Sequence, residues 1–567
     1  MDIWRINVRT QSLQREPTPD TWQRLGGRGL AARILLDEID ATCDPLGPRN
    51  KLVFAPGLLV GHMLSSCDRI SVGAKSPLTG GIKESNAGGR TGLALTHLGI
   101  KALIVEDQPT AGWWTLHLSA DGARFEPADE LRGLGVYDAA PRLIERYGHK
   151  AAIALIGPGG EVGLLASGIQ NLDKDRVPSR INARGGLGAV MGSKGLKAIV
   201  IDASAGARPP IADLAAFRQA QQEFNRALAA SDETRSYADY GTAAMTLVCN
   251  AFGALPTRNF SAGEFEAAEA LSGETLRELL LVRGGESETT HACMAGCIIR
   301  CSNVFGGPDG KAIVSPLEYE TIGLFGANLG IDDLDTVARL NWEANDLGLD
   351  SIEIGAALGV AADGGVWSFG DGERALALMG EIRRLTPLGR VLGNGAAITG
   401  RVLGVRRVPV VKNQAISAYD PRAIKGTGVT YATSPQGADH TAGLTIRARI
   451  DHRDPRGQAK VSRNVQVNMA GFDTLGACIF AGFGFGASPL TIRDLLNARY
   501  AWQVGDHILR ELGRETILLE REFNRRAGFT SADDRLPEWM TTEALPPHGP
   551  VFDVPDQELD GIFDSLM

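Results

Sequence analysis

The sequence lacks the features of a secreted or membrane-spanning protein. Its first residues, MDIWRINVRTQSLQ, contain no apolar core of the kind that a signal peptide has. No run of about 18 apolar residues occurs, so no membrane span is expected. The seven cysteines are an odd number that does not suit a disulfide framework. These absences together predict a protein of the reducing cytoplasm.

An excess of positive charge and short repeats are also missing. The formal net charge of −9 argues against non-specific nucleic-acid binding, which needs a positive field to neutralise phosphates. No internal repeat of 20–50 residues is visible, so a solenoid or propeller is not expected. The length of 567 residues suggests roughly three or four domains.

Glycine, in contrast, is abundant. The chain has 70 glycines, about 12% of its residues, whereas an average protein has about 7%. Short glycine clusters let the backbone approach a ligand closely. The clusters occupy positions 26–29, 79–81, 88–89, 157–160 and 185–188.

Hydrophobic periodicity predicts an α+β protein. In the first 210 residues, short apolar runs predict strands at 51–60, 100–107, 113–120, 151–157 and 196–202, and amphipathic segments predict helices at 26–39 and 136–148. The rest is mainly helical, with helices at 213–231, 332–348, 351–365 and 373–386 and the longest helical region at 491–528. Linkers at 203–213 and near 402–413 predict domains of residues 1–208, 209–405 and 406–567.

Three cysteines in nine residues form the most distinctive local pattern. Cys293, Cys297 and Cys301 cannot share one compact metal centre on a continuous helix, because the outer pair would lie about 12 Å apart along its axis. The segment must therefore curl, and Gly296 permits this. Cys478 in a glycine-rich segment is the best candidate for a fourth ligand. An Fe–S cluster fits this pattern best, while a zinc site and neighbouring free thiols are the alternatives. Cys43, Cys67 and Cys249 are expected to be ordinary buried residues.

Nine segments along the chain carry more information than the cysteines. Those in the N-terminal part are GGRGLAARILLDEI, SVGAKSPLTGG, ESNAGGRTG and RGGLGAVMGSKGLKAI. Those downstream are EYETIGLFGANLGIDDLD, NDLGLDSIEIG, AYDPRAIKGTGVTYATSPQGADH, DTLGAC and EREFNRRAGFTSADDRLPE. In this order they resemble the aldehyde:ferredoxin oxidoreductase family, and the resemblance covers nearly the whole chain.

The resemblance implies a tungsten or molybdenum atom held by the dithiolenes of two pterins (bis-molybdopterin), with magnesium on the pterin phosphates as a further expectation. It implies a β-rich pterin-binding domain followed by two mainly α-helical domains, and one [4Fe–4S] cluster that passes electrons outward. The implied reaction oxidises a small-molecule aldehyde to a carboxylate. The implied electron acceptor is ferredoxin or an Fe–S polyferredoxin subunit, in a homo- or hetero-oligomer.

Matching positions imply contacts to the two pterins. Arg69 and Asn86, with Gly88 beside them, look like contacts of one pterin. The stretch Arg184, Gly185 and Gly186 looks like the contact set of the other. Glycine-rich turns can present backbone N–H groups to phosphates, and arginine can bind a phosphate or a pterin edge with two donors.

The family also has two D-x-x-G-L-(D/C) motifs, one for each pterin. In this chain the second motif runs from Asp473 through Ala477 to the cluster thiol of Cys478. The first motif begins with Asn345 in place of the aspartate and ends with Leu349 and Asp350. An amide can still donate and accept hydrogen bonds, so the resemblance implies that pterin binding is retained there.

Aldehyde oxidation needs a proton acceptor and a group that polarises the carbonyl. The family's glutamate matches Glu320, with Glu318 as a rival, and its histidine matches His440. Tyr319 is expected to donate a hydrogen bond to the substrate oxygen. The simpler interpretations are a helix N-terminal carboxylate for Glu320 and a solvent-exposed loop histidine for His440.

The chain departs from the family pattern in three further places. The cysteine spacing is C-x₃-C-x₃-C rather than C-x₂-C-x₃-C, and Ala442 replaces a basic residue that some members have. No histidine occurs between residues 301 and 439, which removes the subunit-bridging iron site of some members. Two other hypotheses are the reduction of a carboxylic acid or an aromatic acyl-CoA by the same cofactors, and a non-enzymatic Fe–S or zinc scaffold.

Overall fold

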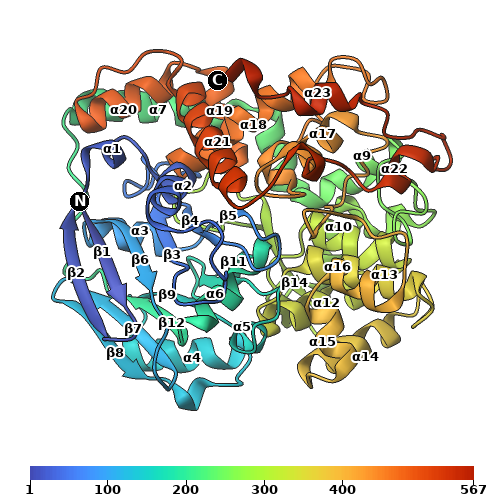
Figure 1. Ribbon diagram of the computed structural model, residues 1–567, viewed down its shortest axis with the longest axis horizontal. Coiled ribbons are helices and arrows are strands. Elements are labelled where there is room, and N and C mark those ends of the chain that lie inside the picture. Colours follow the sequence, from blue (N-terminus) through green and yellow to red (C-terminus); the bar gives the residue numbers. More distant parts are fainter. Residues whose placement is uncertain (567) are drawn as a thin grey trace.

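In the computed structural model, which describes residues 1–566, two six-stranded sheets form the N-terminal part and helices form most of the rest (Figure 1). The first sheet has the order β2-β1-β6-β3-β4-β5 and the second the order β11-β10-β9-β12-β7-β8. The strands of the first sheet are β1 (Asp2–Asn7), β2 (Ser12–Pro17), β3 (Leu52–Pro56), β4 (Ile70–Lys75), β5 (Ile82–Ala87) and β6 (Ile100–Glu106). Those of the second are β7 (Trp114–Ser119), β8 (Gly122–Pro127), β9 (Ala152–Leu155), β10 (Ile169–Leu172), β11 (Pro178–Asn182) and β12 (Leu196–Ile201).

The two sheets have the same topology. Strand β1 pairs antiparallel with β2 and parallel with β6, and β7 pairs in the same way with β8 and β12. The other pairs are antiparallel in both sheets. A similar sequence leads into the sixth strand of each sheet, Gly99-Ile-Lys-Ala in one and Gly195-Leu-Lys-Ala in the other. We call β1 to β6 the first half and β7 to β12 the second half of a duplicated platform. Its repeat is longer than the 20–50 residues that are typical of solenoids and propellers.

Helices occupy equivalent places in the two halves. Helices α2 (Gly27–Glu38) and α4 (Val136–Tyr147) connect the second strand to the third, and α3 (Thr91–His97) and α6 (Leu187–Ser193) precede the sixth strand. The short helices α1 (Asp20–Gln23) and α5 (Pro158–Glu161) lie in connections. The two sheets share a core that includes Phe54, Val72, Leu116 and Ile199. All five predicted strands and both predicted helices of this region are present.

The middle of the chain is helical, with one small sheet. Helix α7 begins after Asp213, whose side chain accepts a hydrogen bond from the Ala216 N–H as an N-cap. Helix α7 packs against α19 and α20 near the C-terminus of the chain (Figure 1). The helices are α7 (Leu214–Ala230), α8 (Asp232–Tyr240), α9 (Met245–Ala251), α10 (Gly273–Arg283), α11 (Tyr319–Thr321), α12 (Leu334–Leu347), α13 (Ser351–Asp363), α14 (Gly372–Arg383), α15 (Pro387–Gly393) and α16 (Ala396–Leu403); the sheet contains β13 (Glu288–His291), β14 (Ser302–Gly306) and β15 (Ala312–Val314).

The last part begins with a hairpin and continues as helices. The predicted long helical region 491–528 is two helices, because residues 501–507 are not helical and Ala501 has a positive φ of 54°. The elements are β16 (Val410–Val411), β17 (Gln414–Ala415), α17 (Lys425–Thr433), α18 (Gln458–Leu475), α19 (Gly482–Ala487), α20 (Thr491–Tyr500), α21 (Ile508–Arg526), α22 (Glu538–Thr542) and α23 (Asp556–Asp560).

The α+β class is confirmed, with a sheet-rich N-terminal part and helices after it. The three domain boundaries stay a prediction. Among residues 1–566, no single helix is long and apolar enough to cross a membrane. The pair Gln458–Leu475 and Ile479–Ala487 meets the length and composition criteria only when it is counted across a bend of 105°.

Candidate active site

Both D-x-x-G-L-(D/C)-like motifs form the C-terminal end of a helix. Helix α12 ends before Gly348 and α18 ends before Gly476, and each glycine has the left-handed conformation (φ 70° and 77°) that terminates a helix. The chain then turns sharply at each end. The two motifs therefore have the same local structure.

Each helix end rests on one half of the platform. The Arg69 N–H donates to the Gly476 carbonyl (3.1 Å), and the Gly168 N–H donates to the Gly348 carbonyl (2.9 Å). The approach is close enough to require glycine in the platform. A Cβ added at Gly57 would lie 2.0 Å from the Gly476 nitrogen. The first half thus binds the second motif, and the second half binds the first.

The cysteine-containing segment is not helical and curls at Gly296, which has a φ of 77°, as predicted. The Ser66 hydroxyl lies 3.4 Å from the Cys297 sulfur, and the Ser66 carbonyl accepts a 2.7 Å hydrogen bond from the Cys478 N–H. One loop of the first half therefore holds both the triplet and Cys478. Burial raises the pKa of the Cys293 thiol to about 12 and also raises the pKa of Cys478.

These four cysteines, which we call the cluster site, are spaced too widely for one metal ion. Among residues 1–566, no three of their sulfurs lie within 4.8 Å of one another. A single zinc ion bound at about 2.3 Å would bring its tetrahedral sulfurs to about 3.8 Å apart. The spacing therefore fits a larger inorganic centre better than zinc.

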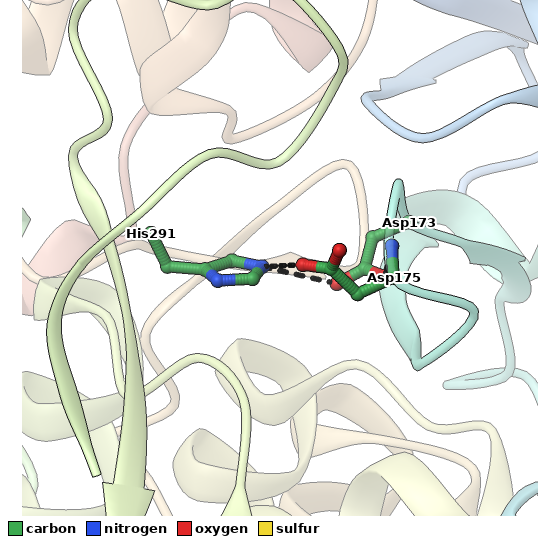
Figure 2. Close-up of side chains that lie close together, drawn as sticks. All are labelled: Asp173, Asp175 and His291. Atoms are coloured by element: carbon green, nitrogen blue, oxygen red, sulfur yellow. Dashed lines mark hydrogen bonds and ion pairs between the residues drawn. The ribbon is translucent and has the colours of Figure 1, made fainter. Parts of the chain in front are cut away.

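The segment that leads into Cys293 is fastened to the platform by His291. Its Nε2 lies 3.3 Å from the Asp173 carboxylate and 3.5 Å from that of Asp175, both in the turn between β10 and β11 (Figure 2). Its Nδ1 lies 2.6 Å from Glu288. Hydrogen bonding to Asp173 raises the pKa of His291, so the imidazolium form is favoured. This group of charges orders the cysteine segment against the second half.

One cavity of about 620 Å³ connects most of the predicted residues. Its lining includes three cluster cysteines, the predicted catalytic residues and both motifs. The predicted residues in the lining are Arg69, Asn86, Gly88, Cys293, Cys301, Tyr319, Glu320, Asn345, Asp350, His440, Asp473 and Cys478. Those outside the lining are Arg184, Gly185, Gly186, Cys297, Leu349 and Ala477.

Glu320 and His440 face each other in this cavity. The His440 Nε2 lies 3.3 Å from the Glu320 Oε1, and the Ala418 N–H donates to the other carboxylate oxygen (2.8 Å). The His440 Nδ1 lies 3.0 Å from the Ser417 hydroxyl, which fixes the ring. Burial raises the pKa of Glu320 above its usual range. A buried carboxylate with one oxygen turned toward a histidine is suited to accepting a proton.

The neighbouring predicted residues have other partners. Glu318, the rival of Glu320, accepts a hydrogen bond from the Thr242 hydroxyl (2.5 Å) and lies 3.8 Å from Arg180. The Tyr319 hydroxyl donates to the Ala418 carbonyl (2.5 Å). That donor is already used, so the geometry does not support the predicted hydrogen bond from Tyr319 to a substrate oxygen.

Arg69 belongs to a buried polar chain that reaches Glu520. The Arg69 guanidinium donates to the Asn86 side chain, and the Asn86 amide donates to Asp473 (2.8 Å). Arg28 then connects Asp473 (3.2 Å) to Glu520 (2.7 Å). Burial raises the pKa of Asp473 to about 6, against the opposing charge of Arg28. The predicted first pterin set is therefore pre-ordered around one carboxylate.

Arg184 has a different environment from the expected one. Its guanidinium donates to the Ser417 hydroxyl (3.1 Å) and the Ala438 carbonyl (2.7 Å) and lies 3.3 Å from Asp350. Asp350 itself accepts the Ile352 N–H as the N-cap of α13. Arg184 thus supports the cavity wall from behind and does not present a free guanidinium to it.

Buried polar atoms without a hydrogen-bond partner indicate where a polar cofactor would fit. The Arg180 Nε is one, in a side chain that lines the cavity and is only 9% exposed. The Glu320 Oε1 is another, because its 3.3 Å contact to His440 lies outside hydrogen-bonding geometry. Such atoms are costly to bury without a partner. The residues present therefore fit a cofactor rich in hydrogen-bonding groups.

Comparison with known proteins supports the same interpretation. Residues 3–203 match the N-terminal domain of aldehyde ferredoxin oxidoreductase, and residues 219–565 match domains 2 and 3 of the same enzyme. The chain belongs to the aldehyde ferredoxin oxidoreductase family. It is therefore an oxidoreductase, and the scaffold hypothesis is excluded.

Three relatives are similar to this chain, two of them over nearly their whole length. The tungsten-containing aldehyde ferredoxin oxidoreductase of Thermococcus kodakarensis is 33% identical over 96% of this chain and 91% of the relative. That of Pyrococcus furiosus is 32% identical with the same coverage. An aliphatic sulfonate oxidoreductase subunit of Pyrococcus furiosus is 26% identical over 75% of this chain and 72% of the relative.

A solved structure has the same fold. It is the active-site complex BamBC of benzoyl coenzyme A reductase, with a TM-score of 0.79 over 100% of this chain and 93% of that one. Its sequence identity of 19% supports similarity of fold alone.

Sequence reasoning missed Arg180 and Arg447, which line the cavity, and Arg28, which pairs with the lining residue Asp473. Arg28 had a visible signal, since GGRGLAARILL is an apolar helix with one charge that must be paired if it is buried. Arg180 precedes the predicted Arg184 set in the same segment. Arg447 gave no signal, because it lies in a polar loop.

Proposed function

We propose that this enzyme oxidises an aldehyde to a carboxylate at a tungsten or molybdenum centre held by two pterins. In the proposed reaction, R-CHO + H₂O gives R-COO⁻, three protons and two electrons. The electrons leave singly through a [4Fe–4S] cluster on Cys293, Cys297, Cys301 and Cys478 to ferredoxin or an Fe–S subunit. The observation that carries the proposal is the single cavity lined by both the Glu320–His440 pair and three cluster cysteines.

The named residues would hold the cofactors from both ends of the cavity. Arg69 and Asn86 lie on the side of the cluster site, and Asn345 and Asp350 lie on the other side, with magnesium expected on the pterin phosphates. When bound, the pterin-held metal would supply a two-electron redox centre that polarises the carbonyl oxygen. Wide sulfur spacing and the curl at Gly296 support an Fe–S cluster despite the extra residue in the C-x₃-C-x₃-C spacing.

Glu320 and His440 would handle the protons. Because burial raises its pKa, the Glu320 carboxylate is a stronger base than an exposed glutamate and can take a proton from the attacking water. The Ala418 N–H keeps one carboxylate oxygen fixed, and His440 faces the other. His440, whose other ring nitrogen contacts the Ser417 hydroxyl, can then relay the proton away from the substrate.

None of the seven cysteines forms a disulfide, and we propose a cytoplasmic location.

A decisive experiment uses anaerobically purified enzyme and a viologen dye as acceptor. We expect aldehyde-dependent dye reduction with two electrons per aldehyde, and one oxygen of the product derived from labelled water. Enzyme with a full metal complement that reduces an aromatic acyl-CoA but oxidises no aldehyde would contradict the proposal.

A further inference from the structure

The mouth of the cavity is marked by its two exposed lining residues. Only Thr441 and Arg447 among the lining residues are exposed, and both belong to the loop between Asp439 and Gly457. The Glu320–His440 pair lies directly inside this loop, because His440 is the neighbour of Thr441. A substrate that enters the cavity beside these two exposed residues therefore passes close to Arg447.

Arg447 is held in place by aromatic side chains from two other elements. Its guanidinium donates a hydrogen bond to the Tyr237 hydroxyl, and its central carbon lies 5.0 Å from the Tyr237 ring centroid. The same carbon lies 4.8 Å from the Phe483 ring centroid. Cation–π contacts of this kind orient a guanidinium while leaving its other N–H groups free.

Arg447 has no close ion-pair partner in the part of the chain that the structure describes. Each lining carboxylate has a basic side chain of another residue close by: Arg180 for Glu318, His440 for Glu320, Arg184 for Asp350 and Arg28 for Asp473. In residues 1–566, no carboxylate lies within 4.0 Å of Arg447. The pKa of Glu233 is lowered mainly by its hydrogen bond from Ser231 and to a smaller degree by the charge of Arg447, which acts on it from beyond 4.0 Å.

Arg69 also lines the cavity without an ion pair, but it lies inside and donates to Asn86. The two unpaired guanidinium groups therefore differ in position, one within the predicted cofactor set and one at the mouth. Apolar and aromatic side chains also line the cavity, among them Leu444, Tyr419 and Met245.

We propose that the substrate is an aldehyde with an apolar or aromatic body and an anionic group at the end remote from the carbonyl, and that Arg447 binds this anionic group. This inference rests on the proposed function and adds the substrate class to it. Carboxylate, sulfonate and phosphate groups share the oxygen geometry that a guanidinium binds with two donors. Arg447 is thus a specificity-determining residue.

The test compares benzaldehydes that carry different groups at the position opposite the aldehyde. The anionic substrates are 4-formylbenzoate and 4-formylbenzenesulfonate, which distinguish the two anion types, and the neutral one is methyl 4-formylbenzoate. We expect the wild type to favour the anionic aldehydes in kcat/KM, and R447M to lose about 10- to 100-fold for them, mainly through KM. The R447M values for the neutral ester should change little, and R447K should keep part of the preference.

The matched control is R449M, since Arg449 is exposed in the same loop but does not line the cavity. It should behave as the wild type. Equal losses for anionic and neutral aldehydes in R447M, or loss of pterin from R447M on cofactor analysis, would overturn the proposal. A wild type without preference for the anionic aldehydes would overturn it as well.

Calorimetric binding of terephthalate, the product of 4-formylbenzoate oxidation, separates this inference from the proposed function. Binding to the wild type that is lost in R447M supports the anion site even if aldehyde turnover fails. Turnover of neutral aldehydes by a wild type that does not bind terephthalate leaves the proposed function intact and contradicts the anion site.

Discussion

The two halves of the platform share a strand order, but equivalent positions carry different side chains. Arg69 and Gly168 both donate a backbone N–H to the carbonyl of the left-handed glycine in the helix end that each half binds. Only the first half therefore has a guanidinium at this point. The second half has no side chain there, and its arginine, Arg184, lies further along the chain.

The helix ends differ in the same way. Cys478 and Asp350 each follow the left-handed glycine by two residues, and their N–H groups donate to Ser66 (2.7 Å) and Ala166 (2.8 Å). One position provides a thiol to the cluster site. The other provides a carboxylate that caps α13 and pairs with Arg184.

The arginines of the two halves have different electrostatic environments because these residues differ. Arg69 lies near the cysteines at positions 478 and 293, whereas Arg184 lies near Asp350 and other carboxylates, including Glu320, which favour its charged form. A duplicated scaffold thus provides two geometrically similar sites. The loop that contacts the cluster site belongs to the first half, whereas Arg184 with its carboxylate neighbours belongs to the second.

The largest expected effect is on the iron content, and it distinguishes Cys478 from Asp350, the residue at the equivalent position of the other helix end. Cys478→Ala should lower the iron and sulfide content, because it removes one of the four thiolates proposed to hold the cluster. Asp350→Asn should keep the iron and sulfide, since Asp350 lies in the helix end that the second half binds. Iron and acid-labile sulfide per chain measure both. Full iron content in Cys478→Ala would show that the fourth ligand is misassigned.

The second effect concerns the two glutamates near the cavity. Glu320→Gln should lower kcat by about 10²- to 10⁴-fold, the usual contribution of a general base. Glu318→Gln, the matched control, should lower it by less than about tenfold, because Glu318 faces Arg180 and not His440. The metal content of both variants should equal that of the wild type. The reverse order of effects would transfer the catalytic role to Glu318.

The third effect compares the two arginines in their contribution to stability. Arg184→Met should reduce the free energy of unfolding by about 3–5 kcal/mol, because it leaves the buried carboxylates of Asp350 and Glu353 without their cation. Arg69→Met should cost less, about 1–2 kcal/mol, because its hydrogen bonds go to the neutral Asn86. Denaturant unfolding under anaerobic conditions measures both values. Equal losses would contradict the distinction between the halves.

The smallest effect is on the pH dependence. Glu320 acts as a base only when it is deprotonated, so kcat/KM should fall as the pH drops through its pKa. Because burial raises that pKa, this fall should occur at higher pH than for an exposed glutamate. The residual activity of Glu320→Gln should lack the acidic limb. A limb that persists in this variant would have to arise from another group.

The sequence predicted the platform strands well because each is a short apolar run bounded by turn residues. It also predicted the curl at Gly296, since a continuous helix cannot bring three such cysteines together. The duplication was missed because its repeat is long and only short stretches, such as those at Gly99 and Gly195, remain similar. The break near Ala501 could not be seen, because helical periodicity continues through it.

The candidate site was predicted in part. The Glu320–His440 pair came from matches to the family and Cys478 from its glycine-rich segment, and the structure brings all three to one cavity. The partners of Tyr319 and Arg184 could not be predicted, because they are the backbone carbonyls of Ala418 and Ala438, far away in the sequence. Arg447 required a tertiary structure to place it at the mouth.

The most direct measurement is the metal and pterin content of anaerobically purified enzyme, determined by mass spectrometry and pterin quantification. The account predicts about four iron atoms, one tungsten or molybdenum atom and two pterins per chain. The same analysis decides between tungsten and molybdenum. Protein that contains zinc alone and no pterin would contradict the account.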